Sequence, residues 1–339
     1  MTNEHTEVTR NYKPTHRWLF RNSDRKRSLF LSWLRNHVLS ISPDEATFTR
    51  RGFRQHDKAS REHLEQVGRC FLDGYHAALA DERIEPLVNR LDGVEAEFRG
   101  FAFEGAAMGL CILDCLSPWK KDRLKSFLDG PGSNHIYMVH VGVGWALARL
   151  PWFMNRTLRT LDPLLGWLAL DGYGFHEGFF HWGRYSTSLR TPRQLLGYEK
   201  RVFDQGLGRS LWFIEGADVR HIPLTIASFP ETRQADLWSG VGLACAYAGG
   251  TQRQAMKNLS AAAGRYKPHL AQGAAFAAKA RQRAKNPTPH TEMACELLCN
   301  MSAEAASDIT DIALKALDHN GAEPSYEVWR RRIRTLLTH

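Results

Sequence analysis

The sequence lacks the short motifs that identify most nucleotide-dependent and hydrolytic enzymes. It contains no phosphate-binding loop of the G-x-x-x-x-G-K-[ST] type and no G-x-S-x-G nucleophile elbow, and none of its G-x-G pairs follows a strand-like segment as a dinucleotide fingerprint requires. Zinc-finger spacing and an RNP pattern are absent as well. We therefore expect neither a nucleotide cofactor nor a nucleic-acid partner, and we assign no cofactor.

Long hydrophobic runs and strand-like alternation are scarce. The most apolar stretch, IYMVHVGVGWALARLPWF, contains His140 and Arg149, so it fits a buried helix better than a membrane span. The first residues are polar and do not resemble a secretory signal. We expect a bacterial cytoplasmic protein with reduced thiols. The two C-x-x-x-C pairs fit either buried packing or a four-sulfur metal site: Cys111 with Cys115, and Cys295 with Cys299.

Positive charge is in excess, with 45 Lys and Arg against 36 Asp and Glu. Residues 10–35 hold eight of the basic side chains and a single acid, Asp24. Such a segment is either a solvated arm or a contact for an acidic partner, and the neighbouring Trp18 and Phe20 would suit a membrane surface. We expect residues 1–45 to form a basic N-terminal arm and residues 46–339 to form a single α-helical repeat domain.

Glycines recur at a nearly constant interval in apolar, helix-forming segments. Successive ones lie 30 to 37 residues apart, and four of the six segments contain G-x-G: Gly105, Gly142, Gly172, Gly206, Gly240 and Gly273. This interval is typical of helix–turn–helix repeats of the tetratricopeptide type. A glycine inside a helix costs about 1 kcal/mol, so close packing between helices must offset it. We predict an all-α fold, a tetratricopeptide-like helical-repeat array or bundle.

Several long segments resemble a bacterial family of unknown function that includes the UnbL-type proteins of enediyne biosynthetic gene clusters. Among them are HIYMVHVGVGWALARLP, LDPLLGWLALDGYGFHEGFF and RQADLWSGVGLACAYAGG, and the resemblance runs from about Phe48 to Arg334. It implies an accessory role beside the enediyne polyketide synthase, during conversion of the polyene product towards the enediyne core. It supplies no catalytic residues, so the chemistry must be argued from this sequence.

One copy of the glycine motif carries unusual chemistry. The segment DGYGFHEGFFHW places His176, Glu177 and His181 among five aromatic residues. An ideal helix separates the two histidines by about 140°, so H-E-x-x-x-H does not fit the H-E-x-x-H zinc motif. They could share an ion only through a kink, a π-bulge or a site at the segment's start, or in an iron site with a remote carboxylate. We assign no metal; acid–base chemistry in an aromatic pocket and a core helix remain the alternatives.

Polar residues beside the other glycines would join this segment if the repeats pack side by side. The candidate catalytic residues are His176, Glu177, His181, His140 and Glu104. The candidate substrate-binding residues are Tyr173, Phe179, Trp182, Arg209, Asp204 and Trp238. Structural roles are the alternative for some of them. Asp204 and Asp236 would then be helix caps, and Arg209 would pair with Glu215.

Two functions fit these observations and the resemblance. The first is an enzyme, or an enzyme subunit, that acts on a long unsaturated polyene or polyyne. The second is a non-catalytic helical scaffold that holds this hydrophobic small molecule or docks other biosynthetic proteins, including an acidic acyl carrier domain bound through the basic arm. Helical repeats commonly bind partners on their concave faces, so the second function stays a substantial alternative to the first.

Overall fold

The computed structural model describes residues 38–117, 119, 122–317 and 321–338. The chain divides into two units, residues 1–40 and Ile41–His339. Most of the expected basic arm, together with Trp18 and Phe20, lies outside the described residues. The account below concerns the second unit.

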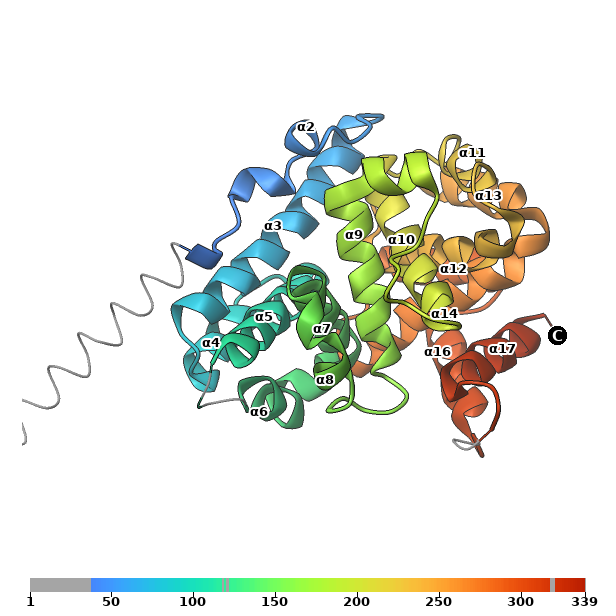
Figure 1. The fold of residues 1–339 in the computed structure, drawn as a ribbon. Helices are drawn as coiled ribbons and strands as arrows, with labels where there is room; N and C mark the ends of the chain where they lie inside the picture. The colour runs from blue at the N-terminus through green and yellow to red at the C-terminus, as the bar shows by residue number, and fades with distance from the viewer. Residues whose placement is uncertain (1–37, 118, 120–121, 318–320, 339) are drawn as a thin grey trace, which may run out of the picture. The chain divides into compact units, whose positions relative to one another are not determined.

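The described part of the chain is helical and contains no strand, which confirms the all-α prediction. The long helices are α3 (Lys58–Ala80), α5 (Ala96–Leu116), α7 (Ile136–Arg149), α9 (Trp167–Ser188), α10 (Glu199–Ile214), α12 (Glu231–Ala248) and α14 (Lys267–Arg283). Most are followed by a shorter helix: α4 (Ile84–Asp92), α6 (Arg123–Asp129), α8 (Met154–Leu158), α11 (Ile222–Ala227), α13 (Arg253–Ala263) and α15 (Pro289–Leu298). This alternation is the two-helix repeat that the glycine interval predicts (Figure 1).

The remaining helices lie before, between and after these repeats. They are α2 (Phe48–Arg51), α16 (Ala303–Leu314) and α17 (Ser325–Leu337), with the short 3₁₀ helices η1 (Pro43–Ala46), η2 (Pro131–His135), η3 (Pro151–Phe153) and η4 (Gly264–Tyr266). Within the residues that the structure describes, no helix combines the length and the apolar character needed to cross a membrane.

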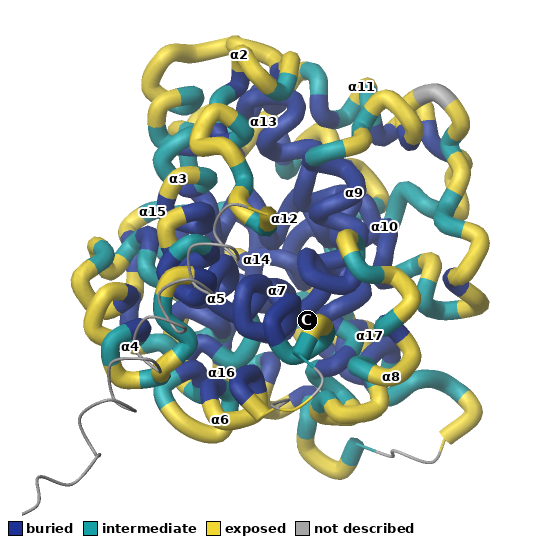
Figure 2. Tube along the Cα trace, turned by 60° about the vertical axis from the view of Figure 1, so that its left-hand side comes forward, coloured by how far each residue is buried: buried dark blue, intermediate teal, exposed yellow. Residues whose placement is uncertain are grey.

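Consecutive long helices pack against one another in chain order, from α3 through α5, α7, α9, α10 and α12 to α14. This row of long helices curves back on itself, so that α14 reaches α5. Arg281, near the end of α14, donates hydrogen bonds to the Glu97 carbonyl of α5 at 2.8 Å and to the Tyr247 carbonyl of α12 at 2.6 Å. The long helices are therefore largely buried, and the short helices carry much of the exposed surface (Figure 2).

The glycine pairs let each inner helix touch both of its neighbours. Residues two apart in a helix point about 200° apart, so the two glycines of a G-x-G face opposite sides. In α9, a Cβ atom on Gly172 would lie 2.0 Å from the Val141 carbonyl oxygen of α7, and one on Gly174 would lie 2.1 Å from the Phe203 carbonyl oxygen of α10. The pairs of α7, α10 and α12 are arranged in the same way. Backbone contact between helices therefore requires glycine at the repeat interval.

The residues directly before these glycines form a buried polar ladder across α9, α10, α12 and α14. The Gln205 amide donates to Asp171 at 2.7 Å. The Ser239 hydroxyl donates to Gln272 at 2.9 Å and lies 3.4 Å from the Gln205 carbonyl oxygen. Arg330 of α17 donates to Gln272 at 3.2 Å. Several polar residues beside the glycines therefore link the repeats through the interior.

The structural roles proposed from the sequence for two aspartates and one arginine are wrong. Asp204 and Asp236 do not cap helices, because α10 begins at Glu199 and α12 at Glu231, which places both aspartates in the buried interior of their helices. Arg209 does not pair with Glu215; it pairs instead with Asp171 of the neighbouring α9. The packing of the repeats offers partners across helices that the sequence distance does not reveal.

Candidate functional site

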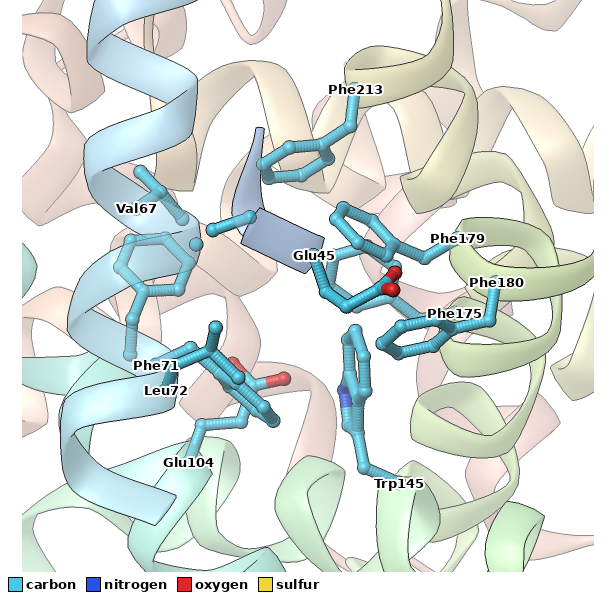
Figure 3. A pocket seen from close by; sticks show the side chains of 13 residues that line it. Glu45, Val67, Phe71, Leu72, Glu104, Trp145, Phe175, Phe179, Phe180 and Phe213 are labelled. Carbon is cyan, nitrogen blue, oxygen red and sulfur yellow. The ribbon is translucent and has the colours of Figure 1, made fainter. Parts of the chain in front are cut away.

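An aromatic pocket lies among α3, α5, α7, α9 and α10 (Figure 3). The cavity that it encloses is narrow, with a volume of about 30 Å³. This is well below the range of about 300–1,000 Å³ typical of small-molecule sites, so a ligand of that size can enter only if the lining side chains move. The ring of Trp145 lies 4.6 Å from that of Phe71 and 4.9 Å from that of Phe175. The lining consists of Glu45, Ala46, Val67, Gly68, Phe71, Leu72, Phe101, Glu104, Trp145, Phe175, Phe179, Phe180 and Phe213.

Glu104 is the buried acid of this pocket. It is 1% exposed, and neither carboxyl oxygen has a hydrogen-bond partner. The indole nitrogen of Trp145 is also buried without a partner and faces the Glu104 carboxyl (Figure 3). Burial raises the pKa of Glu104 to about 7, although the positive charge of Arg209 and the nearby Trp145 indole oppose this shift. Both protonation states of Glu104 are therefore populated near neutral pH.

Ionisation of Glu104 should make stability depend on pH. Its pKa is about 7 instead of the ordinary 4.5, and one pKa unit corresponds to about 1.4 kcal/mol, so charging it in the folded state costs about 3 kcal/mol. Below pH 4.5, Glu104 is protonated in the folded and in the unfolded protein, so the free energy of unfolding is not reduced. This stability is lost as the pH rises through 7. Between pH 4.5 and 8, we expect the wild type to lose about 3 kcal/mol relative to Glu104→Gln in urea unfolding. Parallel pH profiles would contradict the prediction.

A short N-terminal segment covers the pocket. Glu45 and Ala46 of η1 line it, and Arg51 of α2 binds Glu45 at 2.6 Å. Arg51 also donates hydrogen bonds to the carbonyl oxygens of Phe179 and Phe180, at 2.9 and 2.7 Å. Its guanidinium lies 4.8 Å from the centre of the Phe180 ring. These contacts anchor the covering segment to α9, on the wall of the pocket.

Beside the pocket, α9 is broken at His181, whose φ of −129° and ψ of 29° are not helical. There, His176, Glu177 and His181 form what we call the His–Glu–His cluster. Glu177 Oε1 lies 3.5 Å from His176 Nδ1 and 3.2 Å from His181 Nδ1. A kink is one of the conditions under which this sequence spacing lets both histidines share one ion.

The cluster lies against the wall of the aromatic pocket. The His176 ring lies 5.4 Å from that of Trp145 and 4.8 Å from that of Phe180, and both of these residues line the pocket. Burial lowers the pKa of His176, so its imidazole is neutral at neutral pH. Burial also opposes ionisation of Glu177, but the adjacent His176 and the Tyr185 hydroxyl outweigh it and lower the pKa of this carboxyl. The cluster thus combines a carboxylate with a neutral imidazole.

A family comparison covers both of these sites. One family profile, described as a protein of unknown function (DUF1702), matches residues 30–337. The chain belongs to the DUF1702 family. The comparisons with curated proteins and with solved structures gave no match. The DUF1702 description names no reaction, so the function of this family member has to be argued from its sites.

Of the remaining predicted residues, Phe179 lines the aromatic pocket of this DUF1702 protein, whereas the others do not. Tyr173 is buried and accepts a hydrogen bond from Gln194 at 2.7 Å, and burial raises its pKa to about 12. Trp238 is buried in α12. Trp182 is partly exposed, with its ring 6.2 Å from that of Phe229.

Two of the predicted polar residues are engaged in ion pairs. Arg209 binds Asp171 at 2.5 Å, and both side chains are buried. Asp204 accepts a hydrogen bond from Arg233 Nε at 2.8 Å. Burial raises the pKa of Asp204 to about 6, although Arg233 opposes the shift. Neither residue lines the aromatic pocket.

His140 lies in a different cavity, next to Cys111 and Cys115. Its Nδ1 donates to the Ile136 carbonyl at 2.7 Å, which leaves the buried Nε2 without a partner. His140 and Glu104 therefore do not share a cleft. Among the described residues, the only set of at least three His, Cys, Asp or Glu close enough to hold one ion is the His–Glu–His cluster, so the cysteine pairs form no four-sulfur site.

Proposed function

We propose that the protein binds a long, narrow unsaturated chain in the aromatic pocket, as an accessory protein of enediyne-type polyketide biosynthesis. The observation that carries the proposal is the lining, in which seven aromatic side chains surround a narrow cavity next to one buried acid. Aromatic faces and edges pack well against flat conjugated molecules. The resemblance of the sequence to UnbL-type proteins supports a polyene or polyyne intermediate as the natural ligand.

Glu104 would give this pocket a group that exchanges a proton with the bound chain. General acid–base catalysis works best when the pKa of the group lies near the working pH, and burial raises the pKa of Glu104 to about 7. No protein hydrogen bond occupies its oxygens, so they are free to contact a ligand. We infer that Glu104 is the acid–base group, with the Trp145 indole as a neighbouring donor.

A non-catalytic scaffold is the second candidate. The basic segment at residues 10–35 favours it, since this segment suits an acidic acyl carrier domain or an anionic membrane surface. The two functions differ in what they require of Glu104. In a reconstituted pathway, an enzyme loses product formation in Glu104→Gln, whereas a scaffold retains it.

Filling the pocket should block binding of a polyene. Leu72 lines the pocket and is 6% exposed, so a larger side chain at this position would fill the narrow cavity. A conjugated tetraene fatty acid, whose fluorescence rises on transfer from water to an apolar site, is a suitable probe. We expect saturable binding to the wild type and at least tenfold weaker binding to Leu72→Trp, from the loss of about 1.4 kcal/mol or more of binding free energy.

The matched control is Leu224→Trp, which makes the same replacement at a helical position that is 67% exposed and outside the pocket. This variant should bind the tetraene like the wild type. Equal binding to the wild type and to Leu72→Trp would show that the probe occupies another part of the molecule, and it would overturn the assignment of the pocket.

A further inference from the structure

In the His–Glu–His cluster, the distances from the carboxylate to the two imidazoles match those between ligands of one metal ion. Two ligands about 2.0–2.2 Å from a tetrahedral ion lie about 3.3–3.6 Å apart. The distances from Glu177 Oε1 to the two imidazole nitrogens are 3.5 and 3.2 Å, and one ligand atom from each residue lies within 4.8 Å of the other two. We propose that His176, Glu177 and His181 bind one divalent first-row transition-metal ion.

His176 provides an independent observation. Its Nδ1 is buried and has no hydrogen-bond partner, since Glu177 Oε1, 3.5 Å away, forms no hydrogen bond with it. A buried polar atom without a partner is unfavourable, and native interiors satisfy most such atoms. An ion between the three side chains would accept the lone pair of this nitrogen and so give the buried atom a partner.

Neighbouring groups hold two of the three ligands in place. The Tyr185 hydroxyl donates to Glu177 Oε2 at 2.5 Å and leaves Oε1 facing the two imidazoles. The His176 ring is held between Trp145 and Phe180. Hydrogen bonds to metal-bound carboxylates and packing around imidazole ligands are characteristic of metal centres, because they fix the ligands before the ion arrives.

The third ligand provides access from solvent. The His181 side chain is 45% exposed, so an ion can enter without opening the core. Three protein ligands leave at least one coordination position for water or another small molecule. Two nearby positive charges oppose the binding of a cation. The Arg184 guanidinium lies 3.7 Å from Glu177 Oε2, and the charge of Arg149 disfavours positive charge at His176. The Arg184 side chain is 66% exposed and can turn into solvent.

The donor set selects the class of ion. Two imidazole nitrogens and one carboxylate oxygen suit Fe²⁺, Co²⁺, Zn²⁺ and Mn²⁺, and the same set is used by non-haem iron enzymes. Ca²⁺ and Mg²⁺ prefer sites made of oxygen alone. The proposed ion does not depend on the polyene assignment, since its ligands and its test involve no organic ligand.

Cobalt provides the direct test. The full chain, freed of any affinity tag and treated with a chelator, is titrated with Co²⁺ while its visible absorption is recorded. We expect bands that saturate at one Co²⁺ per chain and disappear when Zn²⁺ is added, together with a Zn²⁺-dependent rise in Tm. His181→Ala should abolish this saturable site. Tyr185→Phe keeps all three ligands and should weaken it by about 10–100-fold.

Two further variants separate this site from other histidines and from charge effects. His221→Ala removes a half-exposed histidine that pairs with Asp218, outside the cluster, and this variant should bind Co²⁺ like the wild type. Arg184→Gln removes the opposing charge and should tighten binding. No saturable Co²⁺ binding to the wild type, or a site of equal strength in folded His181→Ala, would overturn the proposal.

Discussion

Replacing Asp171 with asparagine is expected to lower the free energy of unfolding by about 3–5 kcal/mol. Asp171 and Arg209 are buried together, with Oδ1 and Nη1 2.5 Å apart. Asparagine keeps the shape of the side chain and can still accept the hydrogen bond from Gln205, but it leaves the guanidinium in the core without its counter-charge. Equilibrium unfolding in guanidinium chloride measures the loss.

The loss should be smaller at pH 8 than at pH 5, because a second acid lies nearby. Arg209 lowers the pKa of Glu104 and Asp171 raises it. Without the charge of Asp171, Glu104 ionises more readily and, at the higher pH, partly replaces the missing carboxylate. At pH 5 Glu104 is protonated and offers no such compensation.

The control for this prediction is Asp129→Asn. Asp129 pairs with Lys125 one helical turn away in α6, and both side chains are mostly exposed. An exposed pair of this kind contributes about 0–1 kcal/mol. If Asp171→Asn cost no more than Asp129→Asn, the buried pair would not be a major support of the helix row.

The helical repeat was predictable because close packing left a regular trace in the sequence. Glycine recurs wherever one helix must touch the backbone of the next, so its interval reports the length of the repeat. The opposite orientation of the two glycines in Gly172-Tyr173-Gly174 follows from helix geometry as well. The identity of the two neighbouring helices could not be predicted in this way, because it depends on the connections between the long helices.

The candidate site was predictable only where it is local in sequence. His176, Glu177 and His181 attract attention because they lie together in one segment. Their convergence depends on the backbone at His181, and the H-E-x-x-x-H spacing by itself favours an ordinary helix that would separate them. Tyr185, which holds Glu177, was missed because a tyrosine two turns further along is a common core residue.

The aromatic pocket was mostly missed, because its walls come from helices far apart in the chain. Phe71, Trp145 and Phe213 lie on α3, α7 and α10. One signal was available: Trp145 directly follows the second glycine of the α7 pair, at a point where neighbouring helices are closest. Glu104 was found because it precedes a repeat glycine, although its equivalents in later repeats became links of the polar ladder.

Replacing Gly174 with alanine should be as damaging as losing the buried ion pair. The added Cβ would lie 2.1 Å from the Phe203 carbonyl oxygen, and the atoms next nearest to it are also backbone atoms of α10. Backbone atoms cannot turn aside as a side chain can, so α9 and α10 must move apart. We expect a loss of about 3 kcal/mol or more. Because α9 carries Phe175 and Phe179, the displacement should also weaken binding of the tetraene probe.

Gly183→Ala, on the same helix, separates packing from helix propensity. A Cβ at Gly183 would meet no atom within 4 Å. Alanine there is expected to raise stability by up to about 1 kcal/mol, because it favours the helix and restricts the unfolded chain. Opposite signs for the two substitutions would show that Gly174 is required by contact with α10. A similar loss in both would show instead that α9 needs glycine for the flexibility of its own backbone, near the break at His181.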